Sequence, residues 1–154
     1  MTTPAPSPLQ RQLQANVQGE VLVSIFDRGR YATDASIYQI MPLAIVVPRD
    51  IEDVANTIAV AREHGVPVLP RGGGTSQCGQ TVNRAVVIDT SKHLNSIVRI
   101  DAEARTCEVG PGLVLDELNR ALKPLGLWYP VDVSTGSRAT IGGMAGNNSC
   151  GGRT

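Results

Sequence analysis

The stretch LAIVVPRDIEDVANTIAVAREHGVPVLPRGGGTS, residues 43–76, decides the fold of this 154-residue chain. Leu43–Val47 is a short apolar run rich in β-branched residues and flanked by prolines, which predicts a buried strand. Val66–Leu69 predicts a second strand, and between the two lies a helical pattern with Asp50 as N-cap and Gly65 as the stop. The apolar positions of that helix are Ile51, Val54, Ala55, Ile58 and Ala61. This order is a βαβ unit, so its second strand should lie parallel to the first.

Weaker signals surround this unit. Residues 1–8 are polar and proline-rich, which predicts disorder, and Leu9–Phe26 predicts one helix, interrupted near Gly19. Ala85–Asp89 predicts a third strand. Further on, the pattern predicts a hairpin of Ile97–Ile100 with Thr106–Val109, then an amphipathic helix through Leu115, Leu118, Ala121 and Leu122 that ends before Gly126.

The run Gly72-Gly73-Gly74 follows the second strand directly. Glycines let consecutive backbone N–H groups turn toward one small volume, which suits a diphosphate. Thr75 and Ser76 add hydroxyl groups, and Arg71 either compensates phosphate charge or braces the loop. The loop is neither a Walker motif nor the GxGxxG fingerprint. A flexible surface turn remains the alternative.

A second glycine-rich segment, Ala139–Gly151, reads ATIGGMAGNNSCG and contains no charged residue. Gly142-Gly143 permits close backbone approach, and Asn147, Asn148 and Ser149 offer neutral donors and acceptors for a polar ring or a ribityl chain. The alternative is a packed helix start with a purely structural role.

Composition excludes several classes of protein. Basic and acidic residues number 14 each, and aromatic residues are few, which argues against nucleic-acid binding. The cysteines are Cys78, Cys107 and Cys150, with no CxxC pair, so we expect free thiols and no metal site. No apolar run is long enough for a transmembrane segment and no signal peptide is evident, so we expect a cytoplasmic protein.

Several motifs in order resemble the vanillyl-alcohol oxidase family, the FAD-linked oxidases with a PCMH-type FAD-binding domain. The likeness is to the branch of the glycolate oxidase subunit and D-lactate dehydrogenase. The motifs are YATDASIY (31–38), PRDIEDV (48–54), VPVLPRGGGTSQCGQ (66–80), VVIDTSKHL (86–94), VGPGLVLDELN (109–119) and ATIGGMAGNNSCG (139–151). The resemblance implies an N-terminal extension over residues 1–30 and an FAD-binding domain over 31–154, incomplete at the C-terminus. The implied fold class is α+β: a βαβ first subdomain with a mixed sheet, and the start of a second subdomain.

The resemblance also implies the cofactor site. It assigns FAD binding to Arg71, Gly72, Gly73, Gly74, Thr75, Ser76, Gly79, Thr140, Gly142, Gly143, Asn147, Asn148 and Gly151. Some family members carry in this loop a histidine linked covalently to the flavin. Thr75 stands at that place here, so the FAD should be non-covalent. We read His64, His93 and Cys150 as packing or surface residues, and Asp34 and Asp89 as turn or cap residues.

The activity implied for the parent protein is dehydrogenation of a D-2-hydroxy acid such as lactate, glycolate or 2-hydroxyglutarate. The hydride would pass to the flavin. The substrate-binding residues of such enzymes lie in later parts of the family, so we expect no catalytic residue in this chain and weak or absent FAD binding by the isolated chain. The motifs do not encode the electron acceptor. The alternatives are a non-catalytic nucleotide- or phosphate-binding module, a sugar oxidase, or the FAD subunit of a molybdenum hydroxylase.

Overall fold

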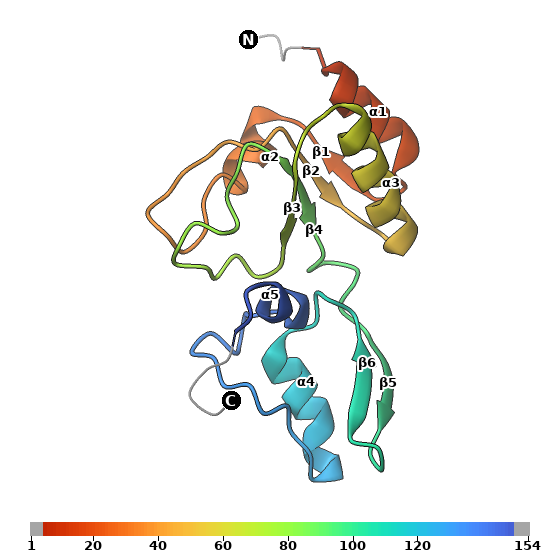
Figure 1. The fold of residues 1–154 in the computed structure, drawn as a ribbon, viewed down its shortest axis with the longest axis vertical. Coiled ribbons are helices and arrows are strands. Elements are labelled where there is room, and N and C mark those ends of the chain that lie inside the picture. The colour runs from red at the N-terminus through yellow and green to blue at the C-terminus, as the bar shows by residue number, and fades with distance from the viewer. Residues whose placement is uncertain (1–4, 150–154) are drawn as a thin grey trace.

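The computed structural model describes residues 5–149, which form two lobes (Figure 1). The first lobe contains α1 (Pro8–Asn16), β1 (Glu20–Leu22), α2 (Ile25–Arg30), β2 (Ala44–Val47), α3 (Ile51–Glu63), β3 (Val68–Arg71) and β4 (Val86–Asp89). The second contains β5 (Ile97–Asp101), β6 (Thr106–Val109), α4 (Leu115–Leu122), the short helix η1 (Lys123–Leu125) and α5 (Ile141–Gly146). Residues 90–96 connect the lobes, and α5 lies at their junction (Figure 1).

The first lobe is built on a four-stranded sheet in the order β1-β2-β4-β3. Strands β2, β4 and β3 run parallel and β1 pairs antiparallel with β2, so the predicted mixed sheet is confirmed. Every residue of β2 and β4 is buried, as expected for strands covered on both faces. One face packs on α1 and α3 through Leu13 and Val60, and the other holds Ile45 and Val87. The βαβ unit is confirmed, with β4 inserted between its two strands.

The helix predicted over Leu9–Phe26 is wrong, because this segment forms α1, β1 and the start of α2. A Cβ on Gly19 would lie 2.2 Å from the carbonyl oxygen of Val47, so the glycine lets the chain pass close to the end of β2. Glu20–Leu22 then pairs with β2 in register. Disorder is also wrong at the end of residues 1–8: Pro8 is helical, and Ser7 caps α1 in a capping box.

The second lobe follows the sequence pattern closely. The predicted hairpin is β5–β6, and Ala104 donates its N–H to Asp101 Oδ1 in the turn. The predicted helix is α4, which buries Leu118 and Leu122 against the hairpin. Gly126 ends η1 at φ 66°, a left-handed conformation that glycine adopts at little cost. None of the helices in residues 5–149 has the length and apolar character needed to cross a bilayer.

Asp53 ties the N-terminal segment to the first lobe. This buried carboxylate accepts backbone N–H bonds from Gln18 at 2.7 Å, Gly19 at 2.9 Å and Arg49 at 2.8 Å. Burial by itself raises the pKa of Asp53, but these hydrogen bonds outweigh burial and hold its pKa below the ordinary value. The carboxylate therefore joins the turn before β1 to the first turn of α3.

Replacing this carboxylate by an amide should lower stability in a pH-dependent way. Asp53→Asn cannot satisfy all the N–H groups, so we expect a loss of about 1–3 kcal/mol in the free energy of unfolding at pH 7. Because the folded pKa is depressed, the contribution of Asp53 is complete above the unfolded pKa of about 4 and disappears as pH falls through the folded pKa. Urea denaturation of wild type and Asp53→Asn from pH 7 to pH 3 measures this effect. The difference between their free energies of unfolding should shrink as pH falls.

The matched control is Glu52→Gln, which removes an acidic charge from an exposed position in the same helical turn. It should change stability by less than about 0.5 kcal/mol. A gap between wild type and Asp53→Asn that stays constant over the pH range would contradict the role given to the carboxylate.

Candidate functional site at the junction of the two lobes

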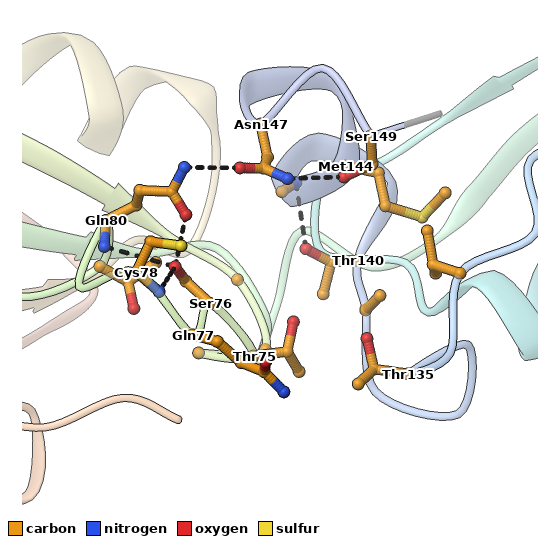
Figure 2. Close-up of a pocket in the computed structure, with 17 residues that line it drawn as sticks. Thr75, Ser76, Gln77, Cys78, Gln80, Thr135, Thr140, Met144, Asn147 and Ser149 are labelled. Carbon is orange, nitrogen blue, oxygen red and sulfur yellow. Dashed lines mark hydrogen bonds between the residues drawn. The ribbon is translucent and has the colours of Figure 1, made fainter. Parts of the chain in front are cut away.

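The two glycine-rich segments face each other across a cavity of about 310 Å³ (Figure 2). One wall is residues 72–79, which follow β3 and are called the glycine loop below. The opposite wall is α5, from its N-cap Thr140 through Gly143 and Met144 to its C-cap Asn147. Segments more than 60 residues apart in the sequence therefore meet in one site, as the motifs predict.

Glycine is required here because the two lobes touch. A Cβ on Gly72 would lie 2.0 Å from Thr140 Oγ1, and one on Gly73 would lie 2.2 Å from the carbonyl oxygen of Arg138. On the other wall, a Cβ on Gly142 would lie 2.6 Å from Pro111 Cβ. Gly72 and Gly73 therefore allow the first lobe to approach the second, whereas Gly142 allows α5 to pack on the turn before α4 within the second lobe.

The glycine loop carries the site's available donors. Among residues 5–149, no acceptor is found for the backbone N–H groups of Gly72–Gln77. The first N–H groups of α5 are already paired: Ile141 with the Leu113 carbonyl, Gly142 with the Pro111 carbonyl, and Gly143 with Thr140 Oγ1. A row of unpaired N–H groups beside a cavity is a suitable cradle for an anionic group such as a diphosphate.

The first cavity is lined by uncharged residues, many of them polar. None of the described residues that line it is charged. Gln80 Nε2 donates to Asn147 Oδ1 at 2.8 Å across the lobes, and Asn147 Nδ2 donates to Ser149 Oγ at 2.9 Å (Figure 2). Gln80 is not among the residues that the sequence predicts to bind the cofactor, although it lies within the motif of residues 66–80. No group of three or more metal-ligating side chains occurs in residues 5–149.

A second cavity of about 270 Å³ adjoins the first. The two share five lining residues: Gly72, Gln80, Thr81, Gly143 and Asn147. The second is more apolar and includes Leu69 and Pro111 in its lining. The junction therefore offers an elongated space with polar and apolar parts, in keeping with a long ligand.

Arg71 has the contacts of a brace, one of the two roles that the sequence left open. Its guanidinium donates to the carbonyl oxygens of Tyr31 at 3.2 Å, Thr81 at 3.1 Å and Thr33 at 2.8 Å. Its central carbon lies 5.2 Å from the centroid of the Tyr31 ring, within range of a cation–π contact. Arg71 contributes to the second cavity and is not among the residues lining the first.

The acidic residues near the loop are structural, as predicted. Asp34 accepts hydrogen bonds from Ser36 and from both the N–H and the hydroxyl of Thr81. Burial raises the pKa of Asp34, but these bonds outweigh burial and lower it overall. Asp89 accepts from Ser91 and from the Tyr31 hydroxyl. Burial and that bond to Asp89 raise the pKa of Tyr31, so the hydroxyl remains a donor at neutral pH.

The remaining predicted site residues are placed differently. Thr75 and Ser76 line the first cavity, and Ser76 Oγ pairs with Gln80. Gly79 adopts φ 73° and packs on Tyr38, where a Cβ would come within 2.6 Å of the ring. Asn148 adopts φ 50° just after α5 and lines neither cavity. Gly151 lies outside the described residues, as does Cys150.

Comparison with known proteins identifies relatives of this chain. A family model described as FAD binding domain matches residues 42–154. The chain is 39% identical over 146 residues to D-2-hydroxyglutarate dehydrogenase of Escherichia coli (strain K12), covering 93% of this chain and 14% of that protein. It is 39% identical over 123 residues to glycolate oxidase subunit GlcD of Bacillus subtilis (strain 168), covering 79% of this chain and 26% of that protein. The chain thus spans a small part of its curated relatives.

Solved structures agree on the fold. Alkyldihydroxyacetonephosphate synthase superposes with a TM-score of 0.79 at 22% identity, covering 94% of this chain and 30% of that one. p-Cresol methylhydroxylase superposes with a TM-score of 0.67 at 21% identity, covering 91% of this chain and 28% of that one. At this identity the likeness concerns the fold alone.

The contact between the lobes can be tested at Gly72. Gly72→Ala forces a methyl group against Thr140, so we expect a loss of about 1–3 kcal/mol in the free energy of unfolding. Urea denaturation measures it. Gly29→Ala in α2 is the matched control, since nothing lies within 4 Å of the added Cβ. The control should be neutral or slightly stabilising, and equal losses in both variants would contradict the close contact.

Proposed function

The chain belongs to the FAD binding domain family, and on that premise we propose that the glycine loop and the start of α5 hold FAD, with its pyrophosphate against the N–H groups of Gly72–Gln77. The single observation that carries this is the unpaired row of donors beside the cavity. Backbone N–H dipoles can bind a diphosphate without a cationic side chain where several of them converge on the same charge.

The other predicted residues have supporting roles in this proposal. Thr140 and Gly143 line the opposite wall of the first cavity and Gly142 lines the second, and the backbone N–H groups of Gly142 and Gly143 are already paired inside the protein. Asn147 and Gln80 bridge the lobes above the cavity and offer amide groups to the polar parts of the cofactor. Thr75 has a hydroxyl at the place where some relatives of this family carry a covalently linked histidine, so we propose that the FAD is held non-covalently.

For the full-length protein we propose dehydrogenation of a D-2-hydroxy acid. Support comes from the relatives, which are named D-2-hydroxyglutarate dehydrogenase and glycolate oxidase subunit. FAD supplies the chemistry by accepting a hydride. The residues of this chain bind and orient the cofactor, and we assign no catalytic residue among them. We also propose a cytoplasmic location, because Cys78 and Cys107 are free thiols.

Flavin content and substrate reduction test the proposal. The purified full-length protein should be yellow and should release FAD on denaturation. Under anaerobic conditions, D-2-hydroxyglutarate, D-lactate or glycolate should bleach the flavin band, and L-2-hydroxyglutarate and L-lactate should not.

Each negative outcome has its own meaning. Absence of flavin together with failure to bind added FAD would contradict the cofactor assignment. Bound FAD that no 2-hydroxy acid reduces would contradict the activity and favour a non-catalytic module or a sugar oxidase. Flavin that stays with the denatured protein would contradict non-covalent binding.

A further inference from the structure

We propose that Arg71 and Asp34 are positioning residues that set the shape of the glycine loop through segment 31–36, and that Arg71 is not the counter-ion of the bound diphosphate. The inference rests on the proposed FAD site and goes beyond it. It brings into the site a segment that lies upstream of the residues matched by the family, 42–154.

Within residues 5–149, the hydrogen bonds of the Arg71 guanidinium all go to protein carbonyl groups. Its two terminal nitrogens donate to three carbonyl oxygens, and its plane lies over the Tyr31 ring. Carbonyl oxygens at these places need a flat, forked donor, which arginine provides and lysine does not. Held in this way, Arg71 connects the end of β3 to the segment that begins at Tyr31.

The glycine loop packs directly against the Arg71 guanidinium. Gly74 has φ 63°, and a Cβ there would lie 2.8 Å from Arg71 Nη2, so the backbone of the loop packs against the guanidinium. The carbonyl oxygen of Gly74 accepts the N–H of Ala35 at 3.2 Å. The middle of the glycine loop is therefore held by both Arg71 and segment 31–36.

Asp34 holds the far side of the same loop. It accepts the Thr81 hydroxyl at 2.9 Å and the Thr81 N–H at 3.3 Å, two residues after the loop ends. Asp34 is itself fixed by the N–H of Ser36 at 2.9 Å. Segment 31–36 thus forms hydrogen bonds with the start, the middle and the end of the stretch from Arg71 to Thr81.

This arrangement predicts effects that charge alone does not. If Arg71 were the counter-ion, lysine would substitute for it, and removing the negative charge of Asp34 would strengthen binding of an anionic cofactor. If both residues act by shaping the loop, Arg71→Lys and Asp34→Asn must both weaken FAD binding. Asp34→Asn therefore has opposite signs under the two explanations.

The experiment measures FAD affinity of the full-length apoprotein by flavin fluorescence at two salt concentrations. We expect Arg71→Lys and Asp34→Asn each to bind FAD roughly tenfold more weakly, with the salt dependence of wild type, because the charge contacts to the diphosphate are unchanged. Exposed positions away from the site provide the controls: Arg84→Lys and Glu103→Gln should bind FAD as wild type does.

Wild-type affinity in Arg71→Lys, or unchanged or tighter binding in Asp34→Asn, overturns the inference. If thermal melting shows that Asp34→Asn is unfolded, Asp34→Glu decides. It keeps the charge but moves the carboxylate, so weaker binding supports the inference and wild-type binding overturns it. Failure of the wild-type apoprotein to bind FAD refutes the proposed function instead, and the two failures are therefore distinguishable.

Discussion

The close approach of Gly72 to Thr140 is the constraint on which the rest of the site depends. Only a residue without a Cβ leaves room for the Thr140 hydroxyl at this point, and that hydroxyl also caps α5. The contact brings the end of a parallel sheet against the first turn of a helix from the other lobe. The two cavities lie at this junction, and the first is lined largely by the loop after β3.

The two sides of the junction differ in what they can offer a ligand. The first turn of α5 has spent its backbone donors on Leu113, Pro111 and Thr140. The glycine loop keeps its donors because no strand or helix continues through it. Its shape is held by contacts with segment 31–36: hydrogen bonds made by the Arg71 and Asp34 side chains, and the backbone bond from the Ala35 N–H to the Gly74 carbonyl oxygen. A rigid scaffold that presents unpaired N–H groups needs no reorganisation when an anion arrives.

Local patterns account for the part of the fold that could be predicted. The βαβ unit, the hairpin and α4 have strong periodicity and clear stops, and each forms as predicted. β1 escaped prediction because it is only three residues long and exists through its pairing with β2. The partners of Arg71 could not be predicted for a similar reason: they are backbone carbonyls, which have no signature in the sequence. The Gln80–Asn147 bond joins residues from different lobes and depends on the full fold.

A crystal structure of the full-length protein with FAD would locate the diphosphate. We expect pyrophosphate oxygens within hydrogen-bond distance of the N–H groups of Gly72–Gln77, with the Arg71 guanidinium still on the carbonyls of Tyr31, Thr33 and Thr81. A diphosphate bound away from the glycine loop, or an Arg71 side chain turned onto the phosphates, would contradict this expectation.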